Sequence, residues 1–192
     1  MSTLETRLEA ILAETPGLMA VMRAARGLEL PDWLIFSGAI YQPVWNHLTG
    51  RPLGLGLKDY DLGYFDASDL SYEAEDVIIR RAAAVFDGWT AAPVEVRNQA
   101  RVHLWFEDHF GEPYAPLRSS AEALTRFVAP AFCIGARLLP DDGLQIVAPF
   151  GLEDLFGLRL QPNPRRPTTN FMRVAEGVRR RWPELTVTAP HA

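Results

Sequence analysis

Apolar residues recur every three or four positions in the first two stretches of the chain, 4–14 and 17–28. This spacing places the apolar side chains on one face of a helix. The two stretches are separated by Thr15-Pro16-Gly17, a sequence that is typical of a turn. The pattern therefore predicts a helical hairpin, which we assign to residues 1–30.

Short apolar runs alternate with helical patterns along the rest of the chain. The predicted strands lie at 58–65 and 93–97, followed by a hairpin of 132–139 and 144–149, and residues 33–36 are predicted to form a strand or a buried helix turn. The predicted helices lie at 41–50, 69–88, 98–110, 151–158 and 171–182. This alternation is typical of an α/β (α+β) layer fold with helices packed on a sheet.

The length and composition indicate one domain. A chain of 192 residues of which 48% are apolar can bury a sizeable core. We therefore expect a single domain over 1–192, with the hairpin at 1–30, a core at 31–165 and a C-terminal helix and tail at 166–192.

For two of the predicted helices the sequence also predicts the roles of individual side chains. Within 69–88 one face is expected to pack toward the core through Val77, Ile78, Ala82 and Val85. Asn98 is expected to cap the next helix. We also expect three large aromatic residues to belong to the core rather than to a base-stacking surface, namely Trp45, Trp105 and Phe106.

Charge and cysteine content narrow the functional class. The net charge of −5 is not that of a non-specific nucleic-acid binder. Residues 159–181 differ, with seven arginines and one acid. We interpret Arg179, Arg180 and Arg181 mainly as a solvated helix end, with docking of a phosphate-rich partner as the alternative.

The single cysteine, Cys133, lies in an apolar run and is expected to be buried. No stretch is typical of a signal peptide or a membrane span, so we expect a cytoplasmic protein.

The segment KDYDL, residues 58–62, holds two aspartates one residue apart. In an extended chain Asp59 and Asp61 lie on the same face, where their charges repel each other. The pattern indicates either an exposed turn or a divalent cation between the carboxylates. A third acid, Glu95, lies on the next predicted strand with Val94 and Val96 on the opposite face. Three carboxylates on two neighbouring strands are typical of a site for two magnesium ions that act in phosphoryl transfer.

Four stretches of the chain resemble a bacterial nucleotidyltransferase-like protein family of the DNA polymerase β nucleotidyltransferase superfamily. They are SGAIYQPVWNHLTGRP, LKDYDLGYFD, VEVRNQARVHLWF and APFGLEDLFGLRLQPNP, and together they extend from about residue 37 to residue 164. The resemblance implies a small mixed sheet flanked by helices. It also implies Mg2+, with Mn2+ as a second option, on Asp59, Asp61 and Glu95, and a nucleoside triphosphate near Ser37 and Gly38.

Three cations beside these acids are candidate phosphate ligands. Lys58 is the only lysine in the chain and precedes Asp59, so a compact ammonium group beside a phosphate is one interpretation and a solvated side chain is the other. Arg97 and Arg101 follow Glu95, and Arg101 falls in the first turn of a predicted helix. For both arginines the alternative is a structural ion pair with Glu95.

The sequence thus predicts an enzyme that transfers a nucleoside monophosphate from a triphosphate to an acceptor and releases pyrophosphate. A phosphatase that uses an aspartyl-phosphate is disfavoured, because Leu62-Gly63 follows Asp61 where that class has Gly-Thr. A nucleotide-binding or regulatory module without turnover stays open. The base, the acceptor (small molecule, protein or RNA) and the oligomeric state also stay open.

Overall fold

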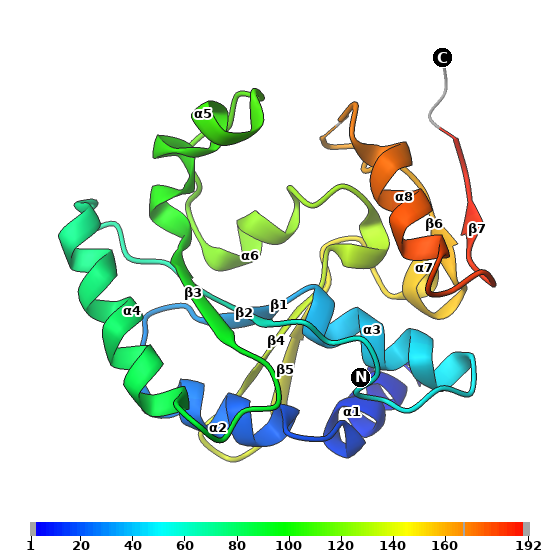
Figure 1. The fold of residues 1–192 in the computed structure, drawn as a ribbon, viewed down its shortest axis with the longest axis horizontal. Coiled ribbons are helices and arrows are strands. Elements are labelled where there is room, and N and C mark those ends of the chain that lie inside the picture. Colours follow the sequence, from blue (N-terminus) through cyan, green and yellow to red (C-terminus); the bar gives the residue numbers. More distant parts are fainter. Residues whose placement is uncertain (1–2, 167, 190–192) are drawn as a thin grey trace.

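A mixed β-sheet lies at the centre of the computed structural model, which describes residues 3–166 and 168–189 (Figure 1). In this part of the chain the sheet has five strands in the order β3-β2-β1-β4-β5. Their bounds are β1 (Leu34–Phe36), β2 (Tyr60–Tyr64), β3 (Val94–Asn98), β4 (Gly135–Leu138) and β5 (Leu144–Val147). Strands β2 and β3 are parallel and the other neighbours are antiparallel. The predicted small mixed sheet is therefore confirmed.

Helices cover both faces of the sheet (Figure 1). In the view of Figure 1, α2 (Leu18–Gly27) lies below the sheet and α4 (Tyr72–Phe86) lies to its left, while α5 (Phe106–Phe110), α6 (Ser120–Leu124) and α8 (Phe171–Arg179) lie above it. The remaining helical elements are α1 (Thr3–Glu14), α3 (Gly38–Leu48), η1 (Gln99–Leu104), η2 (Pro130–Phe132) and α7 (Glu153–Phe156). A second sheet pairs β6 (Arg159–Leu160) with β7 (Thr186–Val187).

The predicted helical hairpin is present as α1 and α2. Its buried residues Leu8, Leu12 and Met22 belong to the same hydrophobic cluster as Ile35 of β1 and Leu62 of β2. The hairpin is therefore packed into the main core. The two outer ends of the predicted domain, 1–2 and 190–192, lie outside the described residues.

Helix α3 is held by two tryptophans in the core. The indole N–H of Trp45 donates to the Leu155 carbonyl at 2.9 Å, and that of Trp182 donates to Asn46 Oδ1 at 3.0 Å. The rings of Trp45 and Trp182 meet edge to face with centroids 5.3 Å apart. Buried aromatic rings with satisfied N–H groups fix their surroundings strongly. These contacts join the C-terminal half of α3 to α7 and to the segment that follows α8.

Several local predictions were wrong. Val77 and Val85 of α4 are 64% and 39% exposed, whereas Ala82 is buried. The reason is that α4 packs beside the edge strand β3, so only a narrow face of the helix is covered. The single helix predicted from Asn98 to residue 110 is divided into η1 and α5, because Trp105 has φ −131° and leaves the helical region. Asn98 does cap η1, since its side chain accepts a hydrogen bond from the Ala100 amide.

Two expectations from the composition can be compared with the structure. Cys133 is buried, two residues before the start of β4, and its burial is as the apolar run indicated. Across residues 3–166 and 168–189, no helix has the length and apolarity that crossing a bilayer requires.

Candidate active site

A cavity of about 410 Å³ lies on the face of the sheet covered by α5, α6 and α8. Its floor is formed by the chain where β1 meets α3 and by the exposed face of β2 and β3. The residues of the floor are Phe36, Ser37, Asp61, Gly63, Glu95 and Arg97. The walls come from segments after β3 and before α8 and include Trp105, Phe106, Tyr114, Arg126 and Arg166. A cavity of this volume is of the size that holds small molecules.

Asp61 and Glu95 are brought together by the parallel pairing of β2 and β3. The register makes Asp61 and Glu95 direct Cα partners. Their neighbours Leu62 and Val96 are buried at 1% and 2% exposure, so the two acids lie on the opposite face, toward the cavity. Asp59 lies just before the first residue of β2, so the prediction that it is a strand residue was wrong. Its side chain is half-buried.

The carboxylates influence each other. The pKa of Asp61 is raised to about 6, first by desolvation within the cavity floor and then by the negative charges of Asp59 and Glu95. Arg97 partly offsets this effect. Asp61 is still reached by solvent. A cation bound at these acids would offset the repulsion between their charges.

Ser37 lies at the start of α3 in a strained backbone conformation. Its φ is 44° and its ψ is −98°, although it is not a glycine, and it is only 8% exposed. Its amide donates to the Ile134 carbonyl at 2.8 Å, and its carbonyl accepts from the Ile40 and Tyr41 amides at 2.9 and 2.8 Å. Strain of this kind persists where the surrounding structure fixes it, often at functional sites. The first-turn amides of α3, from Gly38, begin at the cavity and form a helix N-terminus that favours anions.

The three candidate cations have different surroundings. Arg97 lines the cavity and lies 3.9 Å from Glu95 Oε2, with both side chains about half exposed, at 49% and 53%. Lys58 is exposed and precedes β2. Arg101 is instead buried, forms an ion pair with Glu75 and donates from Nε to the Leu70 carbonyl at 2.9 Å. The structure therefore does not bring Arg101 to the cavity, and its carboxylate partner is Glu75 rather than Glu95.

Comparison with known proteins decides the family. A family described as nucleotidyltransferase matches residues 23–187. The chain belongs to the nucleotidyltransferase family. An NMR structure described as revealing a CCA-adding enzyme head domain matches with a TM-score of 0.76 and 22% sequence identity, over 96% of each chain. At this identity the match shows a shared fold. The comparison with curated proteins found no match.

The donor set in this nucleotidyltransferase family member suits a hard divalent cation. Carboxylate oxygens are the ligands that Mg2+ prefers, and Asp61 and Glu95 present them from adjacent strands with Asp59 nearby. Within the described ranges, however, no three acid, histidine or cysteine side chains converge into a ready cluster for a metal ion. The residues fit the cation by the chemistry of their oxygen donors.

The cavity walls of the nucleotidyltransferase contain residues that the sequence did not single out. Tyr114, Arg126 and Arg166 line the cavity, although they come from segments far from Glu95 in the chain. Trp45 is fully buried, as expected, whereas Trp105 and Phe106 are half-buried and line the cavity instead of lying in the core. The arginine-rich composition of 159–181 was the only sequence signal for Arg166.

Proposed function

We propose that this protein is a magnesium-dependent nucleotidyltransferase that moves a nucleoside monophosphate from a triphosphate to an acceptor hydroxyl or phosphate. The observation that carries the proposal is the register pairing of Asp61 and Glu95 on the floor of a cavity that also includes Ser37 at the start of α3. Acid residues and a helix N-terminus at one cavity are suited to binding a metal–triphosphate complex.

Asp59, Asp61 and Glu95 would hold Mg2+, with Mn2+ as the alternative. The bound ion neutralises charge on the phosphate oxygens and orients them. The raised pKa of Asp61, at about 6, supports this assignment, because it results first from desolvation and then from the charges of Asp59 and Glu95, and a bound cation would favour the ionised form.

The remaining groups bind the substrate and handle the proton. The Gly38 amide and the Ser37 hydroxyl bind the triphosphate tail, since the Ser37 amide already donates to the Ile134 carbonyl, and Arg97 contributes a positive charge from the cavity floor. An acceptor oxygen forms a bond to the α-phosphorus while the bond from that phosphorus to the pyrophosphate oxygen breaks, with its electron pair leaving on pyrophosphate. The acceptor proton passes to the Glu95 carboxylate. Most of the rate enhancement in such chemistry comes from alignment and charge stabilisation.

The experiment is a screen of the four nucleoside triphosphates with Mg2+ or Mn2+. The readout is pyrophosphate release in the presence of a cell extract, followed by mass spectrometry of the modified acceptor. We expect release with the wild type and none with Asp61→Asn. Triphosphate binding without pyrophosphate release or a modified acceptor would favour the regulatory module.

A further inference from the structure

The cavity wall nearest α5 combines aromatic rings with two guanidinium groups. We call Trp105, Phe106, Tyr114, Arg126 and Arg166 the arginine–aromatic wall. The rings of Phe106 and Tyr114 are in tilted contact, with centroids 4.4 Å apart and 35° between their planes. The Arg166 guanidinium lies 4.9 Å from the Phe106 ring centroid, and that of Arg126 lies 5.7 Å from the Tyr114 centroid. All five residues line the cavity.

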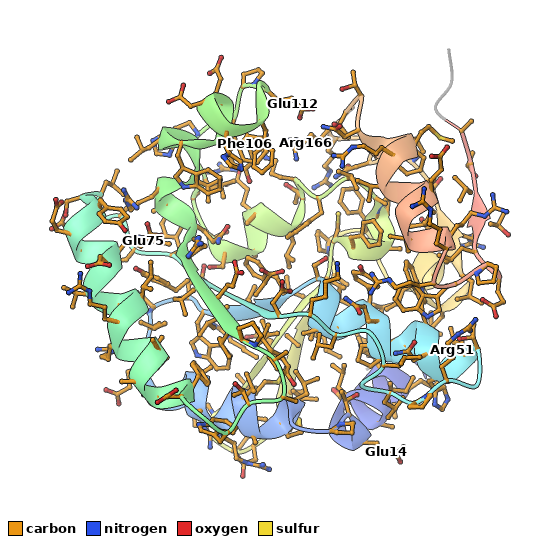
Figure 2. All side chains as sticks on the ribbon, in the orientation of Figure 1. Glu14, Arg51, Glu75, Phe106, Glu112 and Arg166 are labelled. Carbon is orange, nitrogen blue, oxygen red and sulfur yellow. The ribbon has the colours of Figure 1, made fainter. Side chains whose placement is uncertain are left out.

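The two arginines of the wall differ in how many of their guanidinium N–H groups are used in hydrogen bonds and ion pairs within the protein. Arg166 donates to Glu112 Oε2 and to the Arg126 carbonyl, both at 2.6 Å, and Figure 2 shows Phe106, Glu112 and Arg166 together near α5. Arg126 lies 3.6 Å from Glu122, which also binds Arg118 at 3.0 Å. The Arg126 side chain is 29% exposed. Arg166 therefore builds the wall, while Arg126 has donor capacity for an anion in the cavity.

The wall lies on the Glu95 side of the cavity. Strand β3, which carries Glu95, continues through η1 directly into Trp105 and α5. In Figure 1, α5 lies above β3, whereas α3 and α8 lie toward the right of the view, away from β3. A ligand on the wall is thus near the acid assigned to the acceptor proton, while the helix N-terminus assigned to the triphosphate is at the other side.

We propose that the arginine–aromatic wall is the acceptor subsite and that the acceptor is a small molecule with an aromatic ring and an anionic group. This inference rests on the function proposed above. The ring packs against the aromatic side chains, and the anion binds the Arg126 guanidinium, since charge-assisted hydrogen bonds of arginine suit carboxylate and phosphate. A cavity of about 410 Å³ matches a small acceptor beside a nucleotide tail.

The test uses phenyl phosphate and benzoate as probes, titrated by calorimetry into the metal-free protein. Phenol supplies the ring without the anion, and inorganic phosphate supplies the anion without the ring. We expect phenyl phosphate or benzoate to bind more tightly than both phenol and inorganic phosphate. The tighter of these two aryl anions shows whether the acceptor carries a phosphate or a carboxylate group. Arg126→Gln should weaken this binding about tenfold or more. Arg118→Gln is the matched control, because Arg118 pairs with the same Glu122 but is 89% exposed and lies outside the cavity.

A second titration separates the acceptor subsite from the nucleotide site. Phenyl phosphate is titrated again in the presence of Mg2+ and a saturating non-hydrolysable triphosphate with an α,β-methylene bridge. Retained binding supports the proposal, and competition overturns it. If no triphosphate binds, the proposed function fails, whereas aryl-anion binding that Arg126→Gln removes still supports an anion subsite on the wall. Absent binding of both aryl anions, or equal binding by the wild type and a folded Arg126→Gln variant, overturns the inference.

Discussion

Asp61 and Glu95 are Cα partners on the parallel strands β2 and β3, with the whole of α4 between them in the chain. A parallel pair requires a crossover connection, and α4 supplies it. The crossover brings two acids that are distant in sequence to one cavity floor. The role of each acid can be tested by a separate substitution.

Glu95→Gln separates binding from turnover. We expect the variant to retain triphosphate binding, because Asp59 and Asp61 are unchanged, and to lose roughly 10²- to 10⁴-fold in turnover, the range for loss of a general base. Pyrophosphate release and triphosphate affinity measured on the same sample test this. Glu73→Gln, at an exposed acid in the first turn of α4, is the control and should leave both values unchanged. Equal turnover in Glu95→Gln and wild type would remove Glu95 from the mechanism.

Magnesium together with the correct triphosphate should raise the melting temperature. A ligand at a hundredfold excess over its dissociation constant stabilises the fold by about 2.7 kcal/mol. Asp59→Asn combined with Asp61→Asn should abolish the shift, while the ligand-free variant is as stable as the wild type or more so, because repulsion between like charges is lost. Thermal unfolding with each triphosphate measures both effects. A persistent shift in the double variant would contradict the metal assignment.

The pH dependence of Asp61 follows from its raised pKa. The folded-state pKa of about 6 lies above the usual 3.8, so between these values the folded protein binds more protons than the unfolded chain. The contribution of Asp61 to stability therefore falls as pH rises from about 4 to about 6. NMR titration of the Asp61 carboxyl carbon measures the pKa, and Glu95→Gln should lower it because one repelling charge is removed. A titration midpoint near 4 in the wild type would refute this.

The arginines at the end of α8 should differ in their importance for stability. Arg179 and Arg180 are exposed, as expected of a solvated helix end. Arg181 is not part of that solvated end, since its Nη1 donates to the Gly56 carbonyl at 3.0 Å and to Gln42 Oε1 at 3.2 Å. Arg181→Ser should destabilise the fold by about 1–2 kcal/mol through these lost bonds, and changing Arg179 and Arg180 to serine should have almost no effect.

Denaturant unfolding of the two variants gives the comparison. An RNA-binding assay over a range of salt concentrations tests the alternative, in which these arginines bind a phosphate-rich partner. Tight, strongly salt-dependent RNA binding that disappears when Arg179 and Arg180 become serine would indicate a polynucleotide acceptor.

Local patterns in the sequence determined much of the fold. Helical spacing and the turn at Thr15-Pro16-Gly17 indicated the hairpin α1–α2, and alternation around Glu95 indicated that it lies opposite Val94 and Val96. These features depend on residues that are neighbours in the chain, so their physical causes can be read from it directly. The acids of the proposed metal site were found in the same way, from spacing together with family resemblance.

Only the tertiary structure decided which residues meet at the cavity. Arg101 was a candidate for phosphate binding, but α4 brings Glu75 to it and the pair is buried. Arg126 and Tyr114 had no distinguishing local pattern, yet packing of segments distant in sequence lines the cavity with them. The exposure of Val77 likewise depends on α4 lying beside an edge strand. Such contacts join residues far apart in the chain, and their energies depend on the relative positions of whole elements, which no local spacing encodes.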